Sequence, residues 1–171
     1  ASIMPDDFGD LYDPFEGIKD LHRGLIITPT DPDKTFDDDP LRMLRAIRFS
    51  SQLGFNIAPN VLESISRIKG RIEIVSTERV TEEILKLLKT PKPSKGFYLL
   101  KETGMLGIIL PEFDVMGGVE TIEGMSHKDV FVHTLQVIDN ASELTDKMRV
   151  RFAALVHDIA KPQTKKFYKG K

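Results

Sequence analysis

The chain has 171 residues, of which 40% are hydrophobic, and a net charge of −2 at pH 7. This length is sufficient to bury a core, either in one elongated unit or in two small ones. The charge excludes a uniformly basic nucleic-acid binder, so RNA would have to contact local basic patches. Such patches occur at residues 42–48, 67–71, 86–95 and 161–171.

Cysteine is absent, which excludes disulfides and thiolate–metal sites and fits a reducing compartment. The chain opens without a signal-peptide pattern, and no apolar run approaches the roughly 18 residues of a membrane span. We therefore expect a soluble, cytoplasmic protein with no membrane partner. The first residue is not Met and the last residues carry no helix stop, so we also expect a piece of a longer protein.

The pattern of apolar residues, prolines and glycines predicts a mainly α-helical, elongated fold. A small helix should end near Gly24, followed by a short extended segment at residues 25–28. A long helix should then begin at Asp37 or Asp38 and end at Gly54. Further helices are predicted at residues 59–69, 77–89, 94–102, 105–110, 128–144 and 146–160, with a loop at residues 111–126.

The long predicted helix carries a charged stripe. Arg42, Arg45 and Arg48 are three residues apart, so they fall within about 120° of one another on a helix. Asp39 lies one turn before Arg42. The helix would be anchored by a separate apolar face that includes Leu41, Leu44 and Ile47.

Asp39 and Arg42 together form a template for one edge of a nucleobase. Cytosine and adenine each present an amino donor beside a ring-nitrogen acceptor, which a carboxylate and a guanidinium would match. Uracil and guanine present the reverse pattern, and unpaired buried polar groups cost about 1–3 kcal/mol each. Arg45 and Arg48 would then bind a triphosphate or the RNA backbone. The alternative is an ordinary surface ion pair between Asp39 and Arg42, worth a few tenths of a kcal/mol.

The segment DDPLRMLRAIRFSSQLGF closely resembles the neck of the bacterial class of tRNA nucleotidyltransferases and their poly(A) polymerase relatives. In that family an E/D-D-x-x-R motif selects CTP and ATP without a nucleic-acid template. Its Asp and Arg match Asp39 and Arg42, and Asp38 stands where the family usually has Glu. The resemblance implies that tRNA, CTP and ATP are the partners of the parent protein.

The resemblance continues on both sides of this segment. Upstream, LYDPFEGIKDLHRGLIITPTDPDKTF is similar to the segment that joins the catalytic head to the neck. Downstream, STERVTEEILKLL is similar to the next neck helix, with Glu78, Arg79 and Glu83 matching an E-R-x-x-x-E pattern. The resemblance implies four regions, which are the end of the head at 1–36, the neck at 37–110, a loop at 111–126 and the start of a body domain at 127–171.

The catalytic motifs of the family's head do not occur in this chain. That head holds metal ions with a D-x-D pair, so the resemblance implies Mg²⁺ as a cofactor bound outside this chain. Asp31 and Asp33 satisfy the bare D-x-D pattern, but no apolar strand precedes them, and we interpret the segment as a turn. Without such carboxylates, in-line phosphoryl transfer loses its main electrostatic support. We therefore expect this chain alone not to add nucleotides.

The last two predicted helices, within SHKDVFVHTLQVIDNA and RFAALVHDIAKPQTK, resemble the opening of an HD-type phosphohydrolase domain. An adjacent His–Asp pair suits a divalent metal ion, because imidazole and carboxylate can converge on it from one helix end. His157 and Asp158 are that pair, and His133 is the candidate for the first histidine. The closing aspartate of the family's pattern has no counterpart after Asp158. Asp158 could instead cap a neighbouring helix, and His127 is expected to be a surface residue.

Three functional hypotheses follow. The first is that the chain is the neck and partial body of an enzyme that adds CCA, or C and A residues, to tRNA 3′ ends. The second is a metal-dependent HD-type phosphohydrolase. The third is a noncatalytic helical RNA-binding module.

Overall fold

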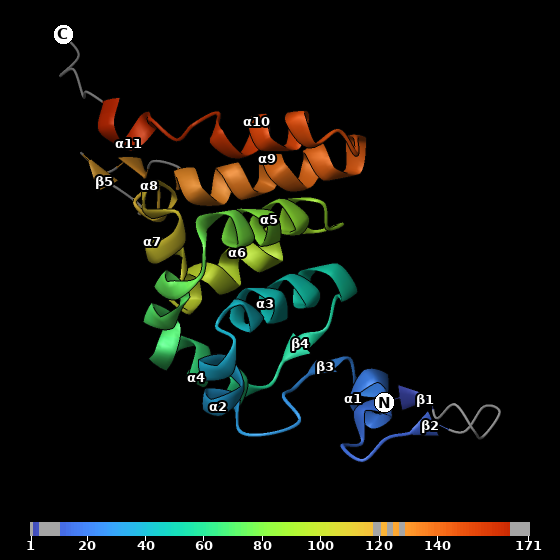
Figure 1. The fold of residues 1–171 in the computed structure, drawn as a ribbon. Helices are drawn as coiled ribbons and strands as arrows, with labels where there is room; N and C mark the ends of the chain where they lie inside the picture. The colour runs from blue at the N-terminus through green and yellow to red at the C-terminus, as the bar shows by residue number, and fades with distance from the viewer. Residues whose placement is uncertain (1, 4–10, 118–120, 123–124, 127–128, 165–171) are drawn as a thin grey trace, which may run out of the picture.

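The computed structural model describes residues 2–3, 11–117, 121–122, 125–126 and 129–164. Helices dominate this part of the chain and stack in an elongated arrangement, from α2 and α4 through α3, α5 and α6 to α9 and α10 (Figure 1). The mainly α-helical, elongated fold that the sequence predicted is confirmed. No helix in the described ranges is long and apolar enough to cross a membrane.

The helices are α1 (Gly17–Arg23), α2 (Pro32–Asp38), α3 (Leu41–Leu53), α4 (Pro59–Ile68), the 3-10 helix η1 (Lys69–Ile74), α5 (Thr77–Leu88), α6 (Pro93–Glu102), α7 (Leu106–Ile109), α8 (Pro111–Asp114), α9 (Val130–Leu144), α10 (Met148–Val156) and α11 (Lys161–Thr164). Strands β1 (Ser2–Ile3) and β2 (Leu11–Tyr12) pair antiparallel, as do β5 (Thr121–Ile122) and β6 (Met125–Ser126). Strands β3 (Leu25–Ile26) and β4 (Asn56–Ile57) pair in parallel, with Leu25 opposite Asn56.

The predicted long helix is wrong at its beginning, because two helices meet there. Asp39 has φ −149° and ψ 95°, an extended conformation that ends α2, and Pro40 precedes α3. The cause is local, since the ring of a proline disfavours the helical conformation in the residue before it. Asp39 is therefore in the link between two helices instead of inside one. This link sets the direction of its side chain.

The segment at residues 31–33, predicted as a turn, is in fact the beginning of α2. The Asp31 carboxylate accepts a hydrogen bond from the Lys34 backbone N–H at 3.0 Å, and Pro32 occupies the first turn. Both are favourable choices at a helix N-terminus. Asp33 is held by Ser64 and Arg67 of α4, with an Arg67 Nη2 to Asp33 Oδ1 distance of 2.7 Å. This ion pair fastens α2 onto α4.

The last predicted helix is also shorter than expected. It ends at Val156, a turn covers residues 157–160, and α11 follows. Pro162 has no backbone N–H, so the helix cannot continue through it with unbroken hydrogen bonding. The turn holds His157 and Asp158, which are thereby separated from the regular helix. The other predicted helices agree with the structure to within a few residues where residues are described.

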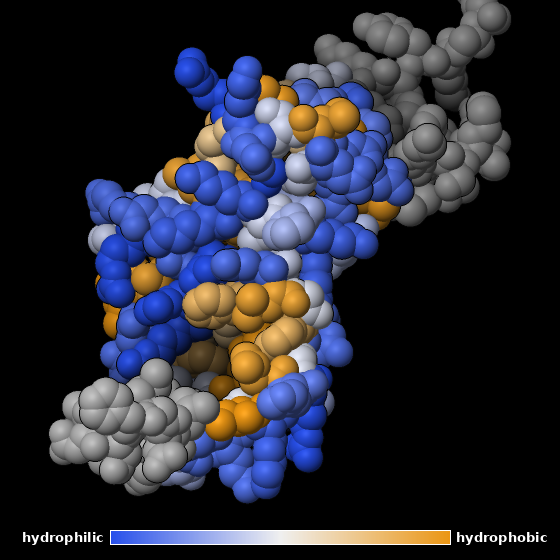
Figure 2. Space-filling view, turned by 90° about the vertical axis from the view of Figure 1, so that its right-hand side faces the viewer, coloured by the Kyte–Doolittle hydropathy of each residue, from blue (hydrophilic) through white to orange (hydrophobic). Residues whose placement is uncertain are grey.

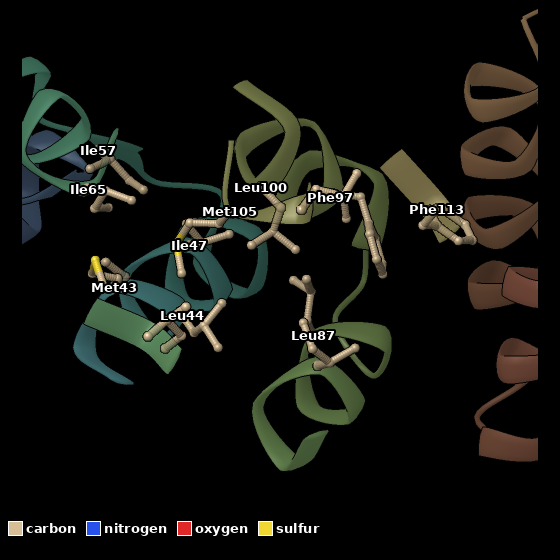
Figure 3. Close-up of a cluster of buried hydrophobic side chains, with 14 of the residues drawn as sticks. Met43, Leu44, Ile47, Ile57, Ile65, Leu87, Phe97, Leu100, Met105 and Phe113 are labelled. Atoms are coloured by element: carbon tan, nitrogen blue, oxygen red, sulfur yellow. The ribbon is translucent and has the colours of Figure 1, made fainter. Parts of the chain in front are cut away.

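The core is centred on α3. Its buried face, formed by Met43, Leu44 and Ile47, packs against α5 and α6 (Figure 3). Gly96 permits the close approach of α5 and α6, because a Cβ there would lie 2.3 Å from Leu87 Cδ1. The apolar periodicity of α3 therefore buries one side of the helix and leaves Arg42 and Arg45 exposed on the other.

A chain of aromatic rings connects this core to α9. Phe97 and Phe113 have ring centroids 5.8 Å apart, and Phe113 and Phe131 are 6.0 Å apart. Arg151 of α10 is buried and donates to the backbone oxygens of Leu88 at 2.8 Å and Thr90 at 3.2 Å. The apolar and polar contacts together fix α9 and α10 against the end of α5.

An apolar hollow of about 320 Å³ remains on the surface between α1, β3 and the end of α3. Figure 2 shows hydrophobic side chains gathered on the lower half of the corresponding face. The hollow is lined on one side by Leu21 and Leu53, which are 63% and 50% exposed. Contiguous exposed apolar surface of this kind marks contacts with another body of protein or with a ligand.

Leu44→Ala should lower the free energy of unfolding by about 2–5 kcal/mol, because it leaves a cavity in the fully packed face of α3. Urea denaturation followed by circular dichroism measures the change. Leu144→Ala is the matched control, since Leu144 is exposed and should change stability by less than about 0.5 kcal/mol. Equal losses for the two variants would contradict the assignment of α3 as the centre of the core.

Candidate functional site

Asp39 and Arg42 lie at the link between α2 and α3, and their charged groups are close but not locked together. The distance from Arg42 Nε to Asp39 Oδ2 is 4.0 Å, which is too long for a hydrogen bond. The side chains are 28% exposed for Asp39 and 48% exposed for Arg42. Each therefore keeps hydrogen-bonding capacity for a third molecule.

Two further contacts hold this pair in position. Arg79 of α5 approaches Asp39 from the other side, with 3.6 Å between Nη2 and Oδ1. Arg42 Nη1 donates to the Thr35 backbone oxygen at 3.3 Å. Asp39 thus lies between two guanidinium groups from two helices. This arrangement presents an acceptor and a donor side by side, as the template hypothesis requires.

The three arginines of α3 do not form one exposed stripe. Arg45 is exposed, whereas the Arg48 side chain is only 12% exposed. Arg48 Nε donates to Glu83 Oε2 at 2.7 Å, and its Nη1 donates to Gln52 Oε1 at 2.7 Å. Arg48 is therefore less free than Arg42 to contact a ligand, because α5 supplies a buried counter-charge. Asp38, at the end of α2, is exposed.

Glu83 is the buried partner that joins α5 to α3. Its side chain is 6% exposed and accepts from Arg48 and from Lys86, the latter at 3.1 Å. Burial alone would raise the pKa of Glu83, but the hydrogen bonds from Arg48 and Lys86 outweigh it and hold the pKa below its usual value. Glu83 is therefore charged and structural in the folded protein.

Glu78 has a different position at the beginning of α5. Hydrogen bonds from its own backbone N–H and from the Ser76 hydroxyl lower the pKa of Glu78. A negative charge in the first turn also interacts favourably with the helix dipole. Of the three neck-motif residues, Glu78 thus stabilises the helix start, Arg79 contacts Asp39, and Glu83 holds Arg48.

A second cluster combines His133 of α9 with the turn after α10. The ligand atoms of His133, His157 and Asp158 all lie within 4.8 Å of one another. His157 Nε2 is 3.2 Å and His133 Nε2 is 3.8 Å from Asp158 Oδ2. The structure therefore brings together the three residues that the sequence singled out. His127 lies outside the described residues.

The hydrogen bonding of His157 fixes the direction of its ring. Its Nδ1 faces the Ala154 backbone oxygen at 2.8 Å, which leaves Nε2 directed at Asp158 Oδ2, 3.2 Å away. Lys161 supplies a positive charge to the cluster, with its Nζ 2.7 Å from Asp158 Oδ2. The sequence reasoning missed Lys161, although its spacing of three from Asp158 was a usable signal.

Comparison with known proteins finds two family models that match this chain and several named relatives. Residues 54–116 match the family model described as the probable RNA and SrmB-binding site of polymerase A, and residues 130–170 match the HD domain. The chain is 41% identical over 168 residues to the Multifunctional CCA protein of Nitrosomonas europaea, covering 95% of this chain and 40% of that protein. It is 39% identical to the protein of the same name from Shewanella frigidimarina, covering 96% of this chain and 41% of that protein.

The chain is also similar in structure to solved CCA-adding enzymes. The Bacillus stearothermophilus CCA-adding enzyme in complex with CTP superposes with a TM-score of 0.71 and 29% identity, over 92% of this chain and 37% of that one. A CCA-adding enzyme complex with ATP has a TM-score of 0.64 and 26% identity, over 96% of this chain and 36% of that one.

These matches define a helical RNA-binding region followed by an HD-type domain. The chain belongs to the bacterial-type family of tRNA nucleotidyltransferases and poly(A) polymerases. It spans about 40% of the length of the curated relatives it matches.

Glu83→Gln should lower the free energy of unfolding by up to about 3–5 kcal/mol, because it leaves the buried Arg48 guanidinium without its counter-charge. Glu82→Gln is the matched control. The neighbouring Glu82 side chain is 69% exposed, and its ion pair with Lys86 is long, at 3.6 Å. Removing the Glu82 charge should therefore cost less than about 1 kcal/mol of stability.

The difference in the free energy of unfolding between the wild type and Glu83→Gln should depend on pH. The folded pKa of Glu83 is lowered, so its stabilisation is present above the unfolded value of about 4.3 and disappears as the pH falls through the lower, folded value. Denaturant titrations at pH 7 and at acidic pH measure this difference. A stability difference that grows as the pH falls would contradict a stabilising role for the ionised Glu83.

Proposed function

We propose that this chain is the base-selecting and RNA-binding region of a template-independent tRNA nucleotidyltransferase, which adds CCA, or C and A residues, to tRNA 3′ ends from CTP and ATP. The observation that carries the proposal is the loose, half-exposed pairing of Asp39 and Arg42 at the α2–α3 link. Supporting it are the family membership and the names of the relatives. Such an enzyme would work in the cytoplasm, where tRNA is processed.

In this proposal, selection is a matter of hydrogen-bond polarity. The Asp39 carboxylate accepts from the exocyclic amino group of cytosine or adenine, and Arg42 donates to the adjacent ring nitrogen. Arg79 helps to orient the Asp39 carboxylate, since it lies 3.6 Å from the other carboxylate oxygen. Uracil and guanine would set a carbonyl oxygen against Asp39 and an N–H against Arg42, so both pairs would be repulsive. Arg45 and Asp38 are exposed beside this site and are proposed to contact the nucleotide.

The chemical step would use groups outside this chain. The tRNA 3′ hydroxyl attacks the α-phosphorus of the nucleotide, and pyrophosphate leaves. Mg²⁺, held by carboxylates elsewhere in the protein, would stabilise the negative charge on the phosphates. Asp31 and Asp33 satisfy the bare D-x-D pattern, but they are on α2 and Asp33 is occupied by Arg67. By itself the chain is therefore proposed to act as a noncatalytic binding module.

Arg42→Ala, in the full-length protein, should slow C and A addition and relax the rejection of U and G. Loss of one pairing is worth about 1–3 kcal/mol, or roughly 5- to 150-fold in selectivity. Single-nucleotide extension of tRNA transcripts that end before CCA, after C and after CC measures both effects. Arg149→Ala, at an exposed position of α10, is the control and should behave as the wild type. Unchanged selectivity in Arg42→Ala would overturn the template role.

A second candidate function, metal-dependent phosphohydrolysis, is favoured by the cluster of His133, His157 and Asp158. Two imidazoles and a carboxylate suit a borderline divalent ion such as Mn²⁺, Zn²⁺ or Ni²⁺. When bound, such an ion would supply an activated water for attack on a phosphate ester. The buried Asp158 and the Ala154 carbonyl would fix the direction of the histidine ring.

Lys161→Met should strengthen binding of Mn²⁺ by a few-fold, because the ammonium group and the metal compete for the same oxygen of Asp158. The lysine of this ion pair is exposed, so the pair is worth about 0.2–1 kcal/mol. Isothermal titration with Mn²⁺ measures the affinity, and Lys147→Met removes an equal charge at an exposed position as the control. Weaker Mn²⁺ binding by Lys161→Met than by the control would show that the lysine supports the site instead of competing with the metal.

A further inference from the structure

A basic pocket of about 480 Å³ lies beside the buried ion pair of α3 and α5. It is lined by Arg48 and Gln52 of α3 and by the end of α5 and the turn after it, at Lys86, Lys89, Thr90 and Pro91. Neither cluster described above includes this pocket. Its walls are polar and cationic, which suits an anion better than an apolar ligand.

The charges around the pocket leave a positive surplus. The carboxylate of Glu83 does not line the pocket, and it is already shared by Arg48 at 2.7 Å and Lys86 at 3.1 Å. Lys86 is also 3.6 Å from Glu82. Lys89 is exposed, and no carboxylate in the described part of the chain lies within ion-pair distance of its ammonium group. Lys89 therefore has a full charge to offer to a ligand.

The backbone carbonyls at the end of α5 already have a hydrogen-bond donor. The last carbonyls of a helix are the negative end of its dipole and would ordinarily repel an anion. Here the buried guanidinium of Arg151 donates to the oxygens of Leu88 at 2.8 Å and Thr90 at 3.2 Å. It satisfies these carbonyls, while its own charge is paired with Asp146 at 3.1 Å.

The position of the pocket points to RNA as the source of the anion. Arg48 and Gln52 stand about 9 and 15 Å farther along α3 than Arg42, at 1.5 Å per residue. The lining residues on α5 and in its turn fall within residues 54–116, which match the RNA-binding family model. Lys92 and Lys95, which line the next hollow, extend the basic surface beyond the turn.

We infer that this pocket binds a backbone phosphate of the RNA substrate. Lys89 is the main cation that contacts the phosphate, and Arg48, held in place by Glu83, forms one side of the pocket. The inference rests on the proposed function and adds to it a place for the RNA strand. While Asp39 and Arg42 read the incoming base, the pocket holds the strand that is being extended. The phosphates of the incoming nucleotide are the other possible source of the anion, and the experiment separates the two.

The test is Lys89→Gln in the full-length protein, with Lys19→Gln as the matched control. Lys19 is an exposed lysine of α1 and does not line the pocket. Binding of a tRNA transcript ending before CCA is measured as a function of salt. Each phosphate contact contributes about 0.7–0.9 to the slope of log affinity against log salt. Lys89→Gln should reduce the slope by about one contact and weaken binding several-fold, while Lys19→Gln matches the wild type.

Two outcomes would overturn the inference. Lys89→Gln could match Lys19→Gln in RNA affinity, salt slope and the KM for CTP, in which case the pocket binds no substrate phosphate. Lys89→Gln could instead raise the KM for CTP with RNA binding unchanged, in which case the phosphate belongs to the nucleotide. The selectivity of the wild type for C over U is measured in the same samples. If the wild type adds neither C nor A, the proposed function fails, whereas the salt slopes still decide the phosphate site.

Discussion

The arrangement of this chain depends on one buried ion pair, between Arg48 of α3 and Glu83 of α5. These side chains are 35 residues apart in sequence and nearly inaccessible to solvent. A charge in such a position is tolerable only when its partner and its hydrogen bonds are in place. The pair therefore fixes how α3 and α5 lie on each other. One turn earlier on α5, Arg79 then meets Asp39, so the packing of two helices determines the geometry of the base-reading pair.

The same helices connect the candidate base-reading site to the second domain. Arg151 of α10 completes the hydrogen bonding of the last turn of α5, and the aromatic contact of Phe113 with Phe131 packs α8 against α9. The cluster of His133, His157 and Asp158 stands on the far side of these contacts. Its residues come from α9 and from the turn that Pro162 enforces, so its geometry depends on where α10 ends. The two candidate sites thus share a continuous, packed scaffold, while each draws its chemistry from its own residues.

Much of this fold follows from local signals in the sequence. Prolines and glycines at the ends of α4 and α6 and the apolar periodicity of α5 and α9 are enough to predict these helices. The family's motifs are likewise enough to single out Asp39, Arg42 and the histidine cluster. Burial, in contrast, cannot be predicted from these motifs. Arg48 lies about 120° from Arg42 on a helical wheel, nearer the apolar face, but the wheel does not reveal its buried partner Glu83, which is distant in sequence.

The differences between the predicted and the observed elements have equally specific causes. The acidic residues before Pro40 suit the start of one long helix, but Pro40 itself disfavours helical geometry at Asp39 and so separates α2 from α3. The parallel pairing of β3 with β4 joins segments about 30 residues apart and only two residues long, too short to show strand periodicity.

The most direct test of the account is a thermodynamic cycle between Asp39 and the amino group it is proposed to read. The full-length protein and its Asp39→Ala variant would each be assayed for kcat/KM with CTP and with an analogue that lacks the 4-amino group. The account predicts that the wild type prefers CTP by roughly 5- to 150-fold, the equivalent of about 1–3 kcal/mol, and that Asp39→Ala treats the two nucleotides alike. The same preference in both proteins would contradict the account, because the amino group would then be recognised by something other than Asp39.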